Sequence, residues 1–127
     1  MKSKNDPRHQ KRIKAIQALF AWGVTGKIDN DDIKPVVEKL AIIDELVTQA
    51  APKWPINQIN KVELAILRYA IWELLNQKDI PPKVVIDEAI EISKEYCDVN
   101  SGSFVNAVLG NILKKQDGQN QSTSEKN

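Results

Sequence analysis

The chain has 127 residues, of which 42% are apolar, and this allows one real hydrophobic core but no second domain. Its 18 basic and 17 acidic residues give a formal net charge of +1, so any binding of nucleic acid must come from local clusters of cations. With one cysteine (Cys97) and one histidine (His9), an internal disulfide, a zinc site and a Ser/His/Asp catalytic set are all excluded. We therefore expect no metal, no cofactor and no enzymatic activity.

The N-terminal segment predicts a helix with one basic face. Residues 1–6 are expected to form a flexible basic N-terminus, and they carry no export signal, so the predicted location is cytoplasmic. Asp6 followed by Pro7 supplies a cap and a first-turn proline for a helix that Gly23 and Gly26 should end. Cations fill much of the arc opposite its apolar stripe: Arg8, Lys11, Lys14 and, at the edge of the stripe, Arg12. Because cations oppose the helix dipole at this end, we interpret them as a phosphate-binding patch, with a solvated basic face as the alternative.

A second helix is predicted from about residue 33 to Ala50, after an acidic turn at 29–32. Its apolar residues alternate at spacings of four and three, which is typical of a seam that packs on another helix. Prolines on both sides of Trp54 end this pattern, and we expect Trp54 to fill the core there. A short apolar connector of about one turn should follow.

The segment 61–75, KVELAILRYAIWELL, is predicted to be the central helix. It is apolar nearly all round, so other elements must cover most of its sides. A helix of this length spans about 22 Å, and it is too short and too charged to cross a membrane. Asn60 should cap it, with Glu63 completing a capping box. The charge of Arg68 should be satisfied inside the bundle, because an unpaired buried cation is not tolerated.

Two further helices are predicted in the C-terminal half. The helix at about 82–96 buries one stripe and carries acids on its other side, which we interpret as an exposed or partner-facing surface: Asp87, Glu88, Glu91 and Glu95. Ser101 should cap the last helix, which ends near Lys115. Residues 116–127 contain no apolar side chain and are expected to form a disordered polar tail.

These patterns predict an all-α fold, a compact helical bundle of five to six helices. The ordered segments VELAILRYAIWELL, IPPKVVIDEAIEISKEY and SGSFVNAVLGNIL resemble the C-terminal half of the NusB family, and RIKAIQALFAW resembles its first helix. The resemblance implies one NusB-like domain over residues 7–115. Between Trp22 and Val36 the chain is shorter than familiar members, which predicts a reduced N-terminal sub-bundle. It also weakens any inference of the homodimer that some members form through this region.

The resemblance implies a non-enzymatic RNA-binding factor in transcription antitermination. Such a factor pairs with NusE, a ribosomal protein of the small subunit, and binds boxA-type single-stranded RNA of ribosomal RNA leaders within the antitermination complex of RNA polymerase. Glu63 matches a position associated with the ribosomal protein. The residues that match RNA-binding positions are Arg8, Lys11, Arg12, Lys14, Phe20, Ser101 and Phe104. The family usually has more arginine in its basic motif and tyrosine at the position of Phe20, and Phe104 is equally well explained as a core residue.

Two other interpretations stay open. The first is a helical protein-interaction module, an adaptor in ribosome assembly or in a transcription complex, which uses its acidic face without touching RNA. The second is a relative of the NusB-like domain that is fused to ribosomal RNA cytosine methyltransferases. The length of this chain leaves no room for the methyltransferase domain.

Overall fold

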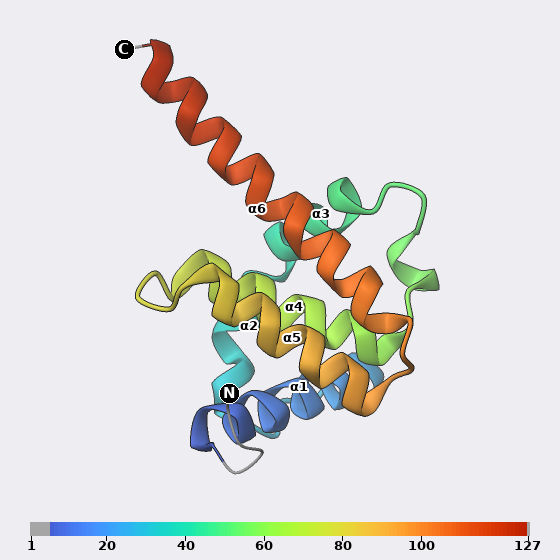
Figure 1. Ribbon diagram of the computed structural model, residues 1–127. Coiled ribbons are helices and arrows are strands. Elements are labelled where there is room, and N and C mark those ends of the chain that lie inside the picture. The colour runs from blue at the N-terminus through green and yellow to red at the C-terminus, as the bar shows by residue number, and fades with distance from the viewer. Residues whose placement is uncertain (1–5, 127) are drawn as a thin grey trace.

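The computed structural model describes the backbone of residues 6–126 and the side chains of residues 6–117, and all regular structure within these limits is helical. Figure 1 shows a bundle from which the last helix projects. The elements in chain order are α1 (Pro7–Thr25), the 3-10 turn η1 (Asp31–Ile33), α2 (Lys34–Glu38), α3 (Leu40–Ala50), the 3-10 turn η2 (Ile56–Gln58), α4 (Lys61–Asn76), α5 (Pro82–Tyr96) and α6 (Ser101–Lys126). The predicted all-α bundle is confirmed. None of the described helices is both long and apolar enough to cross a membrane.

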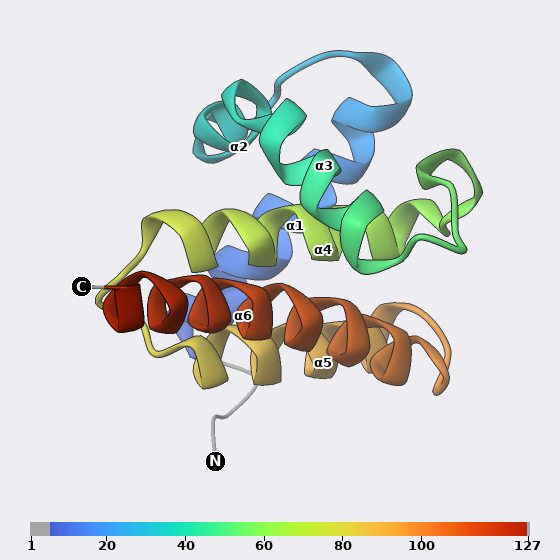
Figure 2. The ribbon, with the colours of Figure 1, turned by 90° about the horizontal axis from the view of Figure 1, so that it is seen from above.

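α4 is the centre of the bundle, as predicted. It contacts α1, α2, α3, α5 and α6, and Figure 2 shows it between the α2 and α3 layer and the α5 and α6 layer. Ile66, Leu67 and Ile71 have no exposed surface. The predicted cap is also present, since the Asn60 side chain accepts hydrogen bonds from the backbone N–H groups of Val62 and Glu63 at 2.9 and 3.1 Å.

The N-terminal third differs from the prediction in its helix boundaries. α1 continues past Gly23 to Thr25 and ends at the second predicted glycine, Gly26, which adopts a positive φ of 76°, a conformation that glycine takes without steric cost. The predicted second helix is divided at Lys39, whose N–H bonds to the carbonyl of Val36 in a tighter turn. The division leaves both Val36 and Ile43 without exposed surface, so each short helix contributes to the core.

Three local predictions about side chains were wrong. Trp54 is 54% exposed, whereas Ala51 and Ile59, at the two ends of this connector, are buried. Glu63 does not complete a capping box, since its carboxylate accepts a hydrogen bond from the Ser101 hydroxyl at 2.5 Å. Ser101 is therefore not the cap of α6, and Asp98 instead accepts from the N–H groups at the start of that helix.

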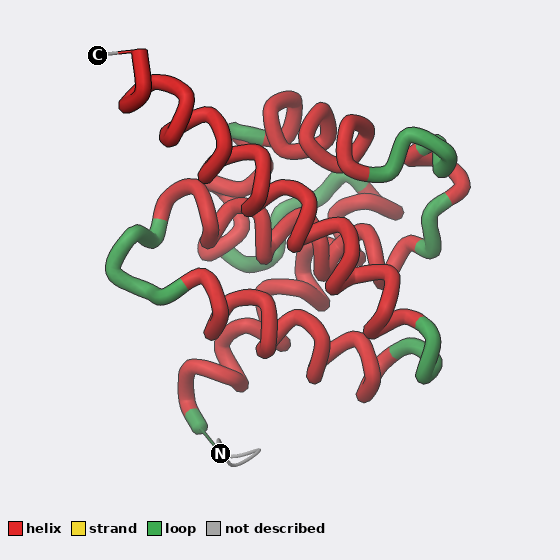
Figure 3. The backbone as a smooth tube through the Cα atoms, turned by 45° about the horizontal axis from the view of Figure 1, so that its top comes forward, coloured by secondary structure: helices red, strands yellow, loops and turns green. Residues whose placement is uncertain are grey.

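The C-terminal segment also differs from the prediction. The backbone is helical through Lys126, where residues 116–127 were expected to be disordered, and α6 runs beyond the bundle in Figures 1 and 3. The segment has no proline, and each residue added to an existing helix gains a hydrogen bond without a new nucleation cost. The predictions for residues 1–5 and Asn127 lie outside the described residues.

Candidate nucleic-acid interface

The first three turns of α1 present cations on the surface of one end of the bundle. The Arg8 side chain is 77% exposed and pairs with Asp6 of the cap at 3.4 Å. Lys11 and Lys14 are exposed, and neither forms an ion pair with a carboxylate of the described residues. We call Arg8, Lys11 and Lys14 the basic face. These three side chains are available for contacts with anions.

Arg12 lies one turn after Arg8, at the edge of the basic face, and is only 7% exposed. Its Nε and Nη2 atoms donate to the two carboxylate oxygens of Glu73 on α4 at 2.8 and 2.9 Å, and Nη1 donates to Glu88 on α5 at 3.0 Å. Burial alone would lower the pKa of Arg12, but hydrogen bonds and attraction from the two carboxylates raise it above its usual value. Arg12 therefore stays charged and fixes α1 to two other helices.

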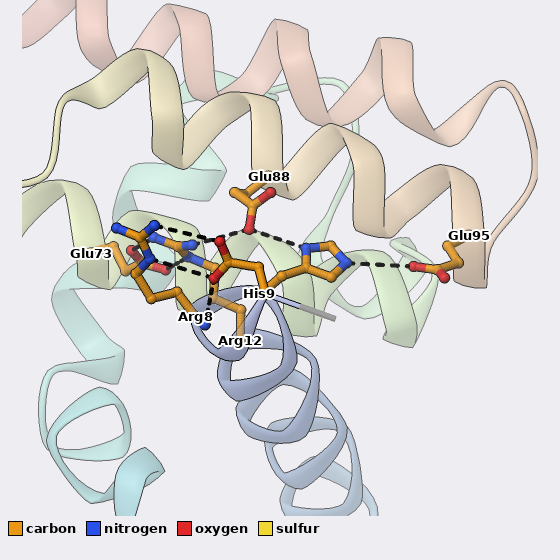
Figure 4. Close-up of polar contacts among 7 residues, drawn as sticks. Arg8, His9, Arg12, Glu73, Glu88 and Glu95 are labelled. Atoms are coloured by element: carbon orange, nitrogen blue, oxygen red, sulfur yellow. Dashed lines mark hydrogen bonds and ion pairs between the residues drawn. The ribbon is translucent and has the colours of Figure 1, made fainter. Parts of the chain in front are cut away.

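His9 extends this buried ionic cluster, which consists of His9, Arg12, Glu73 and Glu88 (Figure 4). The imidazole is 2% exposed, with Nδ1 at 3.1 Å from Glu88 and Nε2 at 3.8 Å from Glu95. The prediction that Glu88 belongs to an exposed acidic face was wrong, since it is 2% exposed. Removing one partner of such a cluster strands a buried charge, which typically costs about 3 to 5 kcal/mol.

This cluster was not predicted from the sequence, although its residues are spaced like members of the buried stripes of two helices. His9 and Arg12 precede Ile13 and Ile16 at the intervals of a buried stripe, and Glu88 lies between Val85 and Ile92 in the same way. Charged residues at stripe positions on two helices suggest buried partners for each other. The prediction instead grouped Arg12 with the exposed cations.

The polar atoms of the cluster are paired with one another. His9, Glu88 and Glu91 have candidate ligand atoms within 4.8 Å of one another. However, His9 and Glu88 already contact each other, and the same Glu88 oxygen accepts from Arg12. A guanidinium at this distance takes the place of a cation, so the arrangement is structural.

The remaining predicted site residues lie away from the basic face. Phe20 is 39% exposed and, being twelve residues further along α1, lies about 18 Å from Arg8 along the helix axis. Ser101 is buried and Phe104 packs partly against the core. Ser101 and Glu63 are brought together by their hydrogen bond. Next to them, burial raises the pKa of the Cys97 thiol despite a hydrogen bond with Ser101, as expected for a half-buried cysteine at a helix end.

A pocket of about 360 Å³ opens beside the basic face, between α1, η1 and α4. Tyr69 and Trp72 form part of its wall, with ring centroids 5.7 Å apart and planes tilted by 36°. Burial and the charge of Glu73 raise the pKa of Tyr69 to about 12. Asp31 and Asp32 line the side formed by η1. This basic end therefore combines exposed cations with aromatic rings and carboxylates.

The known sequences that are similar to this chain include NusB proteins from several bacteria. The model of the NusB family matches residues 33–114. The chain is 52% identical over 133 residues to the transcription antitermination protein NusB of Clostridium botulinum, an alignment that covers 85% of this chain and 98% of that protein. It is 47% identical over 83 residues to the protein of the same name from Thermotoga maritima, covering 65% of this chain and 58% of that protein.

Comparison with solved structures agrees. The fold matches T. maritima NusB with a TM-score of 0.77 and 36% sequence identity, covering 90% of this chain and 93% of that one. It also matches a protein chain in the crystal structure of a plectonemic RNA supercoil with a TM-score of 0.77 and 26% identity, covering 86% and 95% of the two chains.

Proposed function

The chain belongs to the NusB family, and on this basis we propose that it is an RNA-binding transcription antitermination factor. In this proposal it pairs with the small-subunit ribosomal protein NusE and binds boxA-type RNA of ribosomal RNA leaders in the cytoplasm. It acts by binding within the antitermination complex of RNA polymerase and catalyses no reaction. The observation that carries the proposal is the basic face, held in place by the buried ionic cluster.

The two sides of the first turns of α1 have different roles in this proposal. Arg8, Lys11 and Lys14 contact RNA phosphates, helped by the positive end of the helix dipole. Arg12 was predicted to make a phosphate contact too, but its guanidinium is buried and donates to Glu73 and Glu88. We therefore assign Arg12 the role of positioning the basic face.

The proposed RNA path continues from the basic face toward the other predicted residues. Phe20, half exposed on α1, would stack on a base, which is how single-stranded RNA is commonly held. Ser101 and Phe104 at the start of α6 would contribute only at their exposed edges, because both are largely buried. Glu63 remains the proposed contact for NusE, and copurification of NusE with the tagged protein tests that pairing.

The test of RNA binding is a salt titration with a single-stranded boxA-like RNA. Replacing Arg8, Lys11 and Lys14 together by Ala should weaken binding and reduce the slope of log affinity against log salt by about 0.7 for each phosphate that is no longer neutralised. The matched control replaces Lys27, Lys53 and Lys78 by Ala, three exposed lysines outside the basic face. The control has the same net charge as the test variant.

The two variants separate local contacts from net charge. We expect the control to keep most of the affinity and the parental slope. If both variants bound RNA equally weakly, the basic face would have no special role. If the test variant kept the parental affinity and slope, the alternative of an adaptor without RNA contact would be favoured.

A further inference from the structure

The pocket beside the basic face combines side chains that no simple ion would use together. Its volume of about 360 Å³ lies at the small end of the range of roughly 300 to 1,000 Å³ for small-molecule sites. Three cations and three carboxylates line it: Arg8, Lys11, Arg12, Asp31, Asp32 and Glu73. Because the formal charges cancel, neither a lone phosphate nor a lone cation is strongly favoured. A ligand that has an anionic group at one end and hydrogen-bond donors at the other fits better.

The aromatic wall indicates that this ligand also has a flat ring. Trp72 is half-buried and so keeps part of its surface open, whereas Tyr69 is 6% exposed behind it. Since burial raises the pKa of Tyr69 to about 12, the phenol stays protonated and uncharged at neutral pH. Unstacked bases of single-stranded RNA are typically held on aromatic faces of this kind.

The two carboxylates of η1 are not equivalent. Asp31 is 86% exposed and pairs with Lys34 at 3.2 Å. Asp32 makes no side-chain hydrogen bond or ion pair with the described residues, yet its charge contributes to raising the pKa of Tyr69, so it lies near the aromatic wall. Its backbone N–H is fixed by the Asn30 side chain at 2.9 Å. Asp32 is exposed, and its carboxylate, which lacks a partner within the described chain, is free to accept hydrogen bonds from a ligand.

A carboxylate can accept two hydrogen bonds side by side. Among the four bases only guanine presents two adjacent donors, N1–H and the 2-amino group, on its Watson–Crick edge. Uracil has one N–H between two carbonyl oxygens, which would repel a carboxylate. Adenine and cytosine each place an acceptor beside their amino group.

We propose that this pocket receives one guanine base of the bound RNA, with its ring on Trp72, its donor edge on Asp32 and its adjoining phosphates on Arg8 and Lys11. The inference rests on the proposed function. It adds base selection to a surface whose other contacts are to phosphate, which carries no sequence information.

The experiment uses the full chain and two RNAs, a uridine decamer and the same decamer with one central guanosine. We expect the guanosine decamer to bind about tenfold more tightly, because a good bidentate contact discriminates between bases by roughly 1 to 3 kcal/mol. Asp32→Asn should abolish this preference. Asp29→Asn is the matched control, since it removes an exposed carboxylate from the same turn outside the pocket lining.

The expected effect of charge on RNA affinity distinguishes a lost base contact from a change in net charge. Removing a negative charge strengthens binding to any RNA, so both variants should bind the uridine decamer as well as the parent or better. Only Asp32→Asn should make the two RNAs equivalent. Guanosine should also quench tryptophan fluorescence, and this quenching should be absent in Trp72→Phe and kept in Trp54→Phe, because Trp54 lies on a different connector.

Three outcomes would overturn the inference. Equal affinities of the parent for the two decamers would remove the guanine pocket while leaving the phosphate contacts of the proposed function intact. No binding of either decamer would reject the pocket, and the salt titration with boxA-like RNA would then decide the proposed function separately. Binding of free guanosine monophosphate as tight as that of the decamer would assign the pocket to a free nucleotide and not to RNA.

Discussion

Two arginines join helices of this bundle, and their surroundings differ. Arg12 links α1 to α4 and α5 through Glu73 and Glu88, with side chains that are 9%, 4% and 3% exposed. Arg68 links α4 to α3 through a two-bond contact with Asp44, in which the side chains are 13% and 24% exposed. Arg68 also lies 5.9 Å from the ring centroid of Trp22. The contacts of Arg12 are the more deeply buried, so removing one of its partners should cost more free energy of unfolding than removing the partner of Arg68.

The two arginines differ in a second way, because only Arg12 lies next to the exposed basic face of α1. The exposed cations of α1 crowd the positive end of the helix dipole, an arrangement that disfavours a helix. The carboxylates of Glu73 and Glu88 contact the same turns through Arg12 and supply compensating negative charge. Arg68 has no such exposed neighbours to support, and its pair serves the packing of α3 on α4.

The largest effect is expected where the buried ionic cluster is broken at Glu88. Glu88→Ala leaves Arg12 with one carboxylate and His9 without its nearest one, so the free energy of unfolding should fall by about 3 to 5 kcal/mol. Urea unfolding measures this change. Glu91→Ala, an exposed acid on the same helix, should change stability by less than about 0.5 kcal/mol. Equal losses of stability would show that burial of the ionic cluster is unimportant.

A smaller effect is expected from titration of Tyr69, which faces the charges of Arg12 and Glu73. Its pKa is raised to about 12, so the unfolded chain loses the phenolic proton at a lower pH than the folded chain does. Stability should hold below pH 10 and fall by about 2 to 3 kcal/mol as the pH rises toward 12, at about 1.4 kcal/mol per pKa unit. Tyr69→Phe should remove this part of the alkaline loss of stability. A loss unchanged in that variant would assign it to other groups.

The smallest effect is expected at Arg68. Arg68→Ala removes a charge-assisted contact whose carboxylate keeps some access to water, so we expect stability to fall by about 1 to 2 kcal/mol. RNA affinity should fall no further than the loss of one positive charge requires. Lys61→Ala, which removes an exposed cation from the same helix, is the control for charge alone. A fall in RNA affinity with no change in stability would place Arg68 in the binding surface.

The parts of the fold that could be predicted were those set by local chemistry. Asp6 before Pro7 fixed the start of α1, Asn60 fixed the start of α4, and the apolar sequence of α4 identified it as the central helix. The pairing of Arg68 inside the bundle was also predicted correctly, from the cost of leaving a buried cation alone. Each of these predictions needed only neighbouring residues or a general energetic rule.

The candidate site needed information that no short segment contains. Arg12 contacts residues 61 and 76 positions later in the chain, and Glu63 meets Ser101 38 positions later. Periodicity could place Arg12 and Glu88 on buried stripes, but only the packing of three helices decides that these stripes face each other. Local pattern therefore assigned Arg12 to the exposed cations.

The separation between His9 and Glu88, 79 positions along the chain, also has a consequence for biosynthesis. At typical rates of about 5 to 20 residues per second, the ribosome makes Glu88 roughly 4 to 16 s after His9. During that interval the nascent chain exposes the cations of α1 while the carboxylate that anchors them has not been made. The finished basic face therefore arises only after α5 has left the ribosome.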